Sequence, residues 1–237
     1  MSKPSNSEIK LVRSLSAKKF RDREGLFVVE GEKMVAEAID SGFEPLKIWR
    51  RDEIGEDVMK RMSSLSSPSP VLAVLKLPTH ERPSQLPAHG LFLALDGVRD
   101  PGNLGTILRI ADWFGVDGIF ASEDTVDAFN PKTVQSSMGA VFRQRVTYCD
   151  IPKLCRDFKS AGVSICATLL DGDNIYGSTL PSDALLLMGN ESVGLSSEVR
   201  ALADVKLLIP SFAKGRGSES LNVAIATAVC LSEFRRR

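Results

Sequence analysis

Three polar loops carry the side chains that could do chemistry in this sequence, and each follows an apolar run typical of a buried strand. The loops lie within LDGVRDPGNLGTILR, LLLMGNESVGLSSEV and LLIPSFAKGRGSESLN. In a parallel sheet such loops emerge at one edge, which is where open α/β folds bind ligands. The third loop also has Gly215 and Gly217 before a helix start, an arrangement that presents backbone N–H donors. The sequence therefore predicts one composite binding site at this edge.

Several common kinds of site are not indicated by the sequence. It contains no G-x-x-x-x-G-K-[ST] segment, and Ser220 stands where a G-x-G-x-x-G motif needs its third glycine. The first-strand glycine motif of Rossmann methyltransferases is missing as well. His80 and His89 flank a proline-rich stretch, and the four cysteines form no C-x-x-C pair. We therefore expect reduced core cysteines, no metal site and no Ser-His-Asp triad.

The composition is that of an ordinary soluble globular protein. The 237 residues, with 43% hydrophobic and 25% charged side chains, suit one large or two small domains. No apolar run reaches the roughly 20 residues that span a bilayer, and MSKPSNSEIK lacks the apolar segment of a signal peptide, so we expect a cytoplasmic protein. The net charge is zero, but Lys and Arg outnumber Asp and Glu at both ends of the chain. Such ends suit either phosphate-binding patches or solvated faces.

The periodicity predicts two α/β parts, with domain boundaries at 1–78 and 91–237 and a proline-rich linker at 79–90. The first part has an amphipathic helix with a basic face at 7–24, followed by alternating strands and helices at 26–31, 32–42, 45–50, 52–65 and 71–77. In the second part, strands are predicted at 91–97, 117–122, 145–149, 163–170, 184–189 and 205–210. Its helices are predicted at 103–115, 131–139, 152–162 and 196–203, with a last helix that begins at Ser218 or Ser220. Because the strands are apolar throughout, the expected fold class is α/β with a mainly parallel sheet.

Three segments of the second part look like the three motifs of a known family, in the family's order. DPGNLGTILRIADWFG, MGNESVGLS and IPSFAKGRGSESLNVAIA resemble those of the SpoU (TrmH-type) RNA 2′-O-ribose methyltransferases of the SPOUT superfamily. The N-terminal run KKFRDREGLFVVEGEKMVAEAI resembles the family's substrate-binding domain, which is similar to ribosomal protein L30e. Any one motif is moderately specific, and the three in order make the resemblance strong over residues 91–237. Together with the N-terminal run, it accounts for nearly the whole chain.

The resemblance implies a fold and a cofactor. The fold would have a C-terminal deep trefoil knot, in which the last segment threads through a loop, and a small N-terminal L30e-like domain that binds the RNA. In the family S-adenosylmethionine (SAM) lies bent in the knot, held largely by backbone groups. By position, Gly189, Ile209 and Leu221 match the residues that contact SAM. The family is dimeric, with active sites completed at the subunit interface, so the resemblance implies a homodimer.

Five polar residues match the family's catalytic residues by position, namely Asn103, Arg109, Glu191, Ser220 and Asn222. Judged by residue type alone, Arg109 would be a helix-surface arginine and Glu191 an exposed loop acid. Asn103 and Ser220 would be helix N-caps, for which their side chains are favoured. Asn222 falls inside the expected last helix. Because asparagine has a weak helix propensity, its presence there needs an explanation.

The chemistry of the implied reaction is consistent with these residue types. Methylation of a ribose 2′-OH requires in-line alignment of hydroxyl and methyl and the removal of one proton. In the family the arginine is proposed as the base, assisted by a substrate phosphate. Arginine in proteins stays protonated, so Arg109 could instead bind phosphate or stabilise an alkoxide, and its protonation role stays open.

Basic residues of the first helix and of the third loop are candidates for contact with RNA. They are Arg13, Lys18, Lys19, Arg21, Arg23, Lys214 and Arg216. The third loop is longer than the family's usual loop, and its Lys214 and Arg216 either touch RNA phosphates or only keep the loop solvated.

Methylation of large-subunit ribosomal RNA is the favoured function, because family members with such an N-terminal domain tend to act on that RNA. A tRNA 2′-O-methyltransferase is the nearest alternative. A non-catalytic RNA-binding protein on the same scaffold is an alternative of another class, and the five polar residues together argue against it. A small-molecule α/β enzyme that uses the same sheet edge would not explain the basic first helix.

Overall fold

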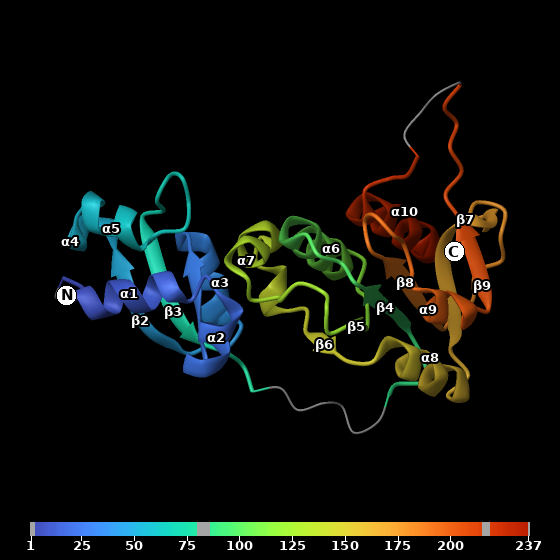
Figure 1. Ribbon diagram of the computed structural model, residues 1–237, viewed down its shortest axis with the longest axis horizontal. Coiled ribbons are helices and arrows are strands. Elements are labelled where there is room, and N and C mark those ends of the chain that lie inside the picture. Colours follow the sequence, from blue (N-terminus) through green and yellow to red (C-terminus); the bar gives the residue numbers. More distant parts are fainter. Residues whose placement is uncertain (1–2, 80–85, 215–218, 237) are drawn as a thin grey trace.

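The computed structural model describes residues 3–79, 86–214 and 219–236, whose strands form two sheets (Figure 1). The strands of residues 26–76 form a three-stranded antiparallel sheet, and those from residue 91 onward form a six-stranded parallel sheet. We refer to residues 6–76 as the N-terminal unit and to residues 91–235 as the C-terminal unit. None of the helices in the described part of the chain has the length and apolar character needed to cross a membrane.

The N-terminal unit has the strand order β1-β3-β2, with β1 (Leu26–Glu30), β2 (Pro45–Arg50) and β3 (Val71–Lys76). Its helices are α1 (Asn6–Ser14), α2 (Lys18–Glu24), α3 (Glu32–Asp40), α4 (Arg51–Ile54) and α5 (Glu56–Met62). The prediction of a single helix at 52–65 is therefore wrong. Gly55, with a φ of 90°, separates α4 from α5 in a conformation that favours glycine.

The helix predicted at 7–24 is also two helices, because a buried arginine interrupts it. The Arg21 guanidinium donates hydrogen bonds to the carbonyl oxygens of Leu15 and Ser16, at 2.7 and 2.9 Å. These carbonyls lie between α1 and α2, where helical N–H partners are missing, so the side chain replaces those partners. α1 therefore ends at its C-cap Leu15, and α2 begins after its N-cap Ala17.

The C-terminal unit has the strand order β6-β5-β4-β8-β7-β9, and the strand pairs of this sheet within the described residues are parallel. Its strands are β4 (Leu91–Asp96), β5 (Gly118–Ala121), β6 (Val146–Tyr148), β7 (Ser164–Asn174), β8 (Ala184–Gly189) and β9 (Val205–Leu208). Its helices are α6 (Pro101–Trp113), α7 (Pro131–Ser137), α8 (Ile151–Ser160), α9 (Ser197–Ala201) and α10 (Val223–Arg235), with a 3₁₀ turn η1 (Ala140–Phe142). The predicted α/β class with a mainly parallel sheet is confirmed.

Two predicted helix starts are wrong. The N-cap of α6 is Asp100, so Asn103 is not a cap but lies in the first turn. The N-cap of α10 is Asn222, whose side-chain oxygen accepts the first free N–H groups of that helix, so Ser220 does not cap it. Ser218 lies outside the described residues. The unfavoured asparagine expected inside the last helix is thus explained, because it stands at the helix start.

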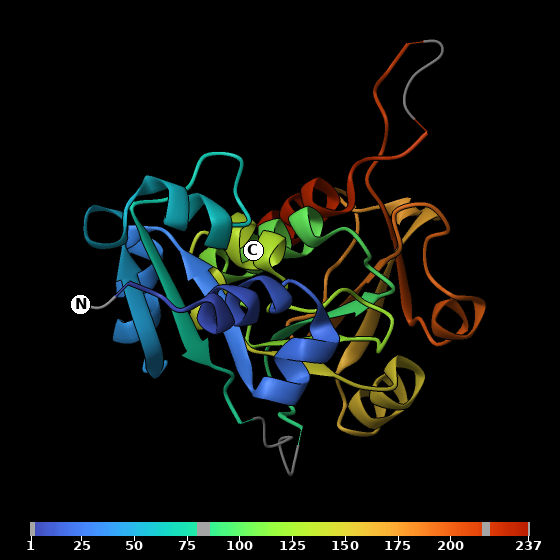
Figure 2. The same cartoon turned by 60° about the vertical axis from the view of Figure 1, so that its left-hand side comes forward.

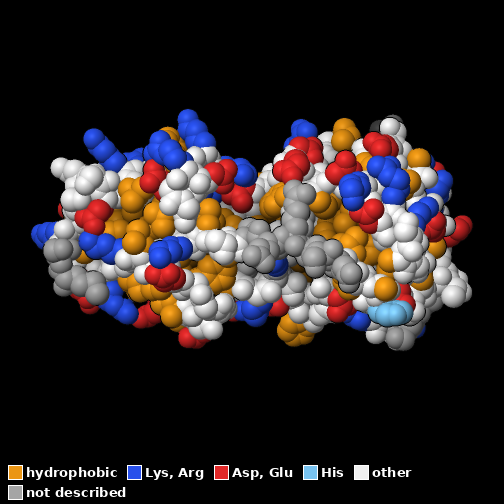
Figure 3. All heavy atoms as spheres, turned by 90° about the horizontal axis from the view of Figure 1, so that it is seen from below, with side chains coloured by type: hydrophobic (Ala, Val, Ile, Leu, Met, Phe, Trp, Pro, Cys, Tyr) orange, Lys and Arg blue, Asp and Glu red, His pale blue; other side chains and the backbone are white. Residues whose placement is uncertain are grey.

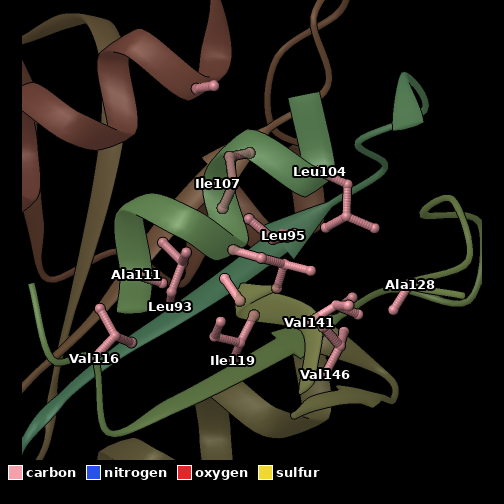
Figure 4. Packing of buried hydrophobic residues seen from close by; sticks show 14 of the residues in the cluster. Leu93, Leu95, Leu104, Ile107, Ala111, Val116, Ile119, Ala128, Val141 and Val146 are labelled. Atoms are coloured by element: carbon pink, nitrogen blue, oxygen red, sulfur yellow. The ribbon is translucent and has the colours of Figure 1, made fainter. Parts of the chain in front are cut away.

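The side chains of β4 alternate between the two faces of the parallel sheet, as expected for a strand covered on both sides. Leu93 and Leu95 are fully buried in a cluster with Leu104 and Ile107 of α6, which Figure 4 shows from close by. Phe92 belongs to a second cluster, under α8 and α9. The first cluster also includes residues of α10 and of β1 and β3, so it continues into the N-terminal unit. The helix that follows β4 is thereby fixed to the centre of the fold.

Helix α6 lies against α7 at a glycine. A Cβ atom added at Gly105 would lie 1.9 Å from Ser136 Oγ, 2.6 Å from the Thr133 carbonyl oxygen and 2.8 Å from the Ser137 backbone nitrogen. Two of these three atoms belong to the α7 backbone, which cannot move aside as a side chain can. The close crossing of the two helices therefore requires glycine at this position.

We expect Gly105→Ala to lower the free energy of unfolding by about 1–3 kcal/mol, because overpacking forces the helices apart. Helix propensity alone would favour alanine by about 1 kcal/mol, so the sign of the change separates packing from propensity. Urea unfolding monitored by circular dichroism measures it. Gly177→Ala is the matched control, since a Cβ there meets only the Asn174 carbonyl oxygen at 3.8 Å. An equal response of the two variants would contradict the packing argument.

Candidate active site

A chain of side-chain hydrogen bonds joins the three loops that follow β4, β8 and β9. The Asn103 amide on α6 donates from Nδ2 to Glu191 Oε1 at 2.9 Å. The Asn222 amide, at the start of α10, donates from Nδ2 to Asn103 Oδ1 at 2.9 Å. Asn103 is thus the central member, because it is acceptor to one loop and donor to the other. The predicted convergence of the three loops at one sheet edge is confirmed by these contacts.

The start of α6 fixes Asn103 in this place. Asp100 Oδ1 accepts the backbone N–H of Asn103 at 2.9 Å, and Lys132 on α7 forms an ion pair with Asp100 at 3.2 Å. The hydrogen bond from the Asn103 N–H, followed by the contacts of Lys132, holds the pKa of Asp100 below its ordinary value. Asp100 is therefore charged at neutral pH and caps the positive end of the helix.

Glu191 is held by donors from the first loop. Its carboxylate accepts the backbone N–H of Asp100 at 3.3 Å and that of Arg99 at 3.4 Å, besides the Asn103 amide. Partial burial disfavours the charged form, but these hydrogen bonds outweigh it and hold the pKa of Glu191 below its ordinary value. A carboxylate with a lowered pKa is a poor proton acceptor at neutral pH and a good hydrogen-bond acceptor.

The loop after β8 folds back over the end of its own strand. The backbones of Asn190 and Gly194 exchange two hydrogen bonds of 3.0 Å, and a Cβ at Gly189 would lie 2.3 Å from the Gly194 carbonyl carbon. The Asn190 side chain donates to the Gly97 carbonyl oxygen at 2.7 Å, which ties this loop to the first. Asn190 and Asp100 belong to the site's framework and were missed in the sequence. Asn190 could have been found because it is an Asx residue directly after a strand, and Asp100 because it is an Asx residue three positions before Asn103.

Arg109 does not join this hydrogen-bonded cluster within one chain. It lies about 1.7 turns beyond Asn103 on α6, so it leaves the helix on a different side. The side chain is exposed, and the structure gives it no hydrogen bond or ion pair with the described residues. Its exposed neighbour four positions along is Trp113, whose side chain is 85% exposed.

The other predicted site residues lie along the same edge with fewer contacts. Gly189 ends β8, Ile209 is half-buried just beyond β9, and Leu221 is 51% exposed next to Asn222. Ser220 is exposed and forms no hydrogen bond with the described residues. The described residues on either side of 215–218 extend away from the sheet (Figures 1 and 2).

The predicted RNA contacts divide into exposed residues and one buried residue. Arg13, Lys18, Lys19, Arg23 and Lys214 are exposed. The prediction for Arg21 is wrong, because this side chain is only 1% exposed and binds Asp127 and backbone carbonyls. Arg216 lies outside the described residues. The His, Cys, Asp and Glu side chains within the described ranges form no group that could hold a metal ion.

Family models match both units of the chain. The model of the SpoU rRNA Methylase family matches residues 90–232. The model of an MRM3-like substrate binding domain matches residues 6–54.

Full-length relatives agree with these matches. The 23S rRNA (guanosine(2553)-2′-O)-methyltransferase RlmP of Bacillus subtilis is 30% identical over 97% of this chain and 96% of its own length. A TrmH-family structure from Porphyromonas gingivalis has a TM-score of 0.86 and 38% identity, with 99% of each chain covered. An AdoMet-bound rRNA methyltransferase of Sinorhizobium meliloti has a TM-score of 0.86 and 32% identity, covering 100% of this chain and 97% of its own. Since the first family model spans more than half of the sequence, and its three motifs meet in one hydrogen-bonded cluster, the chain belongs to the SpoU rRNA methylase family.

Proposed function

We propose that this protein transfers a methyl group from SAM to a ribose 2′-hydroxyl of large-subunit ribosomal RNA, in the cytoplasm. The observation that carries the proposal is the Asn103–Glu191–Asn222 chain, which joins the three family motifs in one place. The Bacillus subtilis relative, which matches over nearly its whole length, is named as a 23S rRNA 2′-O-methyltransferase. This name favours rRNA over tRNA, and the intact cluster argues against a non-catalytic scaffold.

The residues at the strand ends fit SAM. Gly189 has no side chain where the backbone of Gly194 crosses it, so the backbones of the two segments lie close together at the end of β8. Ile209 and Leu221 add partly exposed apolar side chains, which suit contact with a planar base. When bound, SAM supplies a methyl group activated by its sulfonium. The Sinorhizobium relative was solved with this cofactor.

The chain's own residues would orient the hydroxyl and stabilise the charge that develops on it. Asn103 and Asn222 offer amide groups at fixed positions, because Asn103 is held by Glu191 and Asn222 is bound to Asn103. A protonated Arg109 would bind the substrate phosphate or the developing alkoxide, as a guanidinium does without giving up its proton. Alignment of hydroxyl and methyl would supply most of the rate enhancement.

We further propose that the trefoil knot of the family is present and that β9 and α10 form it. β9 pairs with β7 at one end of the sheet, whereas α10 packs against α6 and β8 nearer the middle. The segment between them therefore connects one end of the sheet to its middle. This path supports a threaded C-terminal segment.

We assign residues 1–78 as the RNA-binding domain, 79–90 as the linker and 91–237 as the catalytic domain. The substrate-binding model over residues 6–54 supports the first assignment. Exposed cations on α1 and α2, namely Arg13, Lys18, Lys19 and Arg23, would contact RNA phosphates, as would Lys214 and Arg216 of the third loop.

We propose a homodimer whose contact face includes α6 and α10. Trp113 is 85% exposed on α6, and Ile225 is 52% exposed on α10, which packs beside it. Arg109 lies on α6 four positions before Trp113, so a second copy on this face would cover both side chains. The site would then be completed where the two subunits meet, which explains why Arg109 is apart from the cluster in one chain.

We expect cells that lack this gene to lose one 2′-O-methyl mark in ribosomal RNA, which mapping of ribose methylation in total RNA measures. Wild-type protein should restore the mark and Arg109→Ala should not, because removal of one charge-stabilising donor costs about 10²-fold or more in rate. Calorimetry should show unchanged SAM binding by this variant. Arg156→Ala, on the distant helix α8, is the control. A complete set of marks in cells without the gene would refute the proposed function.

We expect Glu191→Gln to keep much more activity than Glu191→Ala. The lowered pKa of Glu191 makes its carboxylate an acceptor that orients Asn103, and the glutamine oxygen can accept the same hydrogen bond. Methyl transfer measured between about pH 6 and 9 should therefore give the same pH profile for wild type and Glu191→Gln. If Glu191→Gln removed an ionisation that the wild-type profile shows, Glu191 would instead be assigned as a general base.

We expect Trp113→Glu to convert the dimer to a monomer, because a charge would replace the most exposed large apolar side chain of the proposed contact face. Light scattering coupled to gel filtration measures the mass. Leu46→Glu, at a site 55% exposed on β2, should leave the dimer intact. A dimer that survives Trp113→Glu would place the subunit contact elsewhere.

A further inference from the structure

The two units meet at a cluster of aromatic rings. Phe27 of β1 lies 4.7 Å from Phe129, and Phe43 lies 5.3 Å from Phe142, measured between ring centroids. Phe27 and Phe43 belong to the N-terminal unit, and Phe129 and Phe142 to the C-terminal unit. Apolar contacts hold surfaces together but are not directional, so they do not alone fix the angle between the units.

The junction is also incompletely filled beside these rings. A cavity of about 400 Å³ lies between the units, and Phe43, Phe142 and Tyr148 are among its lining residues. Figure 3 shows the molecule from below, with apolar side chains at the surface of both units. Directional contacts are therefore needed to set the orientation.

Arg21 makes a buried directional contact across the junction. Its Nε donates to Asp127 Oδ2 at 2.9 Å and its Nη2 donates to the same oxygen, while Nη1 donates to the Leu15 and Ser16 carbonyls. Asp127 Oδ1 accepts the backbone N–H of Phe129 at 3.1 Å. Arg21 therefore ties the break between α1 and α2 to the loop that carries a ring of the aromatic cluster.

A second ion-pair group crosses the junction at a more exposed place. Arg143 binds Glu37 of α3 and, at 2.7 Å, Asp112 of α6. Gly139 lies beneath Glu37 and has a φ of 93°, and a Cβ there would collide with the Glu37 carboxylate. Exposed pairs of this kind contribute little free energy, whereas loss of one member of a buried pair is costly. Arg21 and Asp127 are thus the main orienting contact.

We propose that Arg21 is a positioning residue, which with Asp127 fixes where RNA bound to α1 and α2 presents its ribose to Asn103. The inference rests on the proposed function. Arg21 lies on α2 among the exposed cations of these two helices and holds the joint between them. Its interaction sets the direction in which those cations face relative to the catalytic cluster. A small error in that direction is magnified over the length of a bound RNA.

The test compares Arg21→Met and Asp127→Asn with wild type in the full-length protein. Fluorophores at Asp52 and Ser182, introduced through a genetically encoded amino acid, report the distance between the units by single-molecule energy transfer. We expect a broader distance distribution in both variants. We also expect kcat/KM on a long rRNA fragment to fall about tenfold or more, since misplacement of reacting groups has large effects. SAM affinity and transfer to a short oligonucleotide, which cannot reach α1 and α2, should stay unchanged.

Asp127→Asn separates positioning from local folding, because it leaves the Arg21 contacts with Leu15 and Ser16 intact. The double variant should be no worse than either single variant, and Arg21→Lys should recover part of the loss. Arg156→Met, an exposed residue of α8, is the control. An unchanged distance distribution, or an equal loss on long and short RNA, would overturn the proposal. If wild type methylates no RNA, the proposed function fails, while the distance measurement still decides whether Arg21 orients the units.

Discussion

The site depends on one side-chain amide that is donor and acceptor at once. Asn103 donates to Glu191 and accepts from Asn222, so it connects three segments that are far apart in the sequence. Aspartate would offer no donor to Glu191, and leucine would remove both of these side-chain hydrogen bonds. Both ends of the amide are used, so its hydrogen bonds fix its orientation and join the neighbouring loops.

The close backbone approaches of the fold serve this connection. Gly105 lets α6 lie against α7, where Lys132 pairs with the Asp100 cap. Gly189 lets the second loop fold back over its strand and bring Glu191 above the start of α6. In both places a methyl group would meet backbone atoms. The position of the site therefore depends on backbone packing at residues that take no part in the reaction.

The sequence predicted the fold class and the strands well, because long apolar runs such as Leu91–Asp96 report burial directly. It also predicted which loops meet, since parallel strands leave little choice. It failed at helix starts, where Asp100 and Asn222 both compete with nearby residues that cap equally well. The interruption by Arg21 could not be foreseen, because Asp127 is remote in the sequence and only the folded chain brings the two together.

The late position of Asn222 in the sequence has a consequence for the order in which the site forms during synthesis. Protein synthesis proceeds from the amino end, so the loops with Asn103 and Glu191 leave the ribosome before Asn222 does. A nascent chain can therefore form most of the parallel sheet while its central amide still lacks one partner. A chain cut short before α10 lacks both Asn222 and the α10 residues that belong to the first core cluster. The last helix thus completes the hydrogen-bonded cluster of the site and the core of the C-terminal unit together.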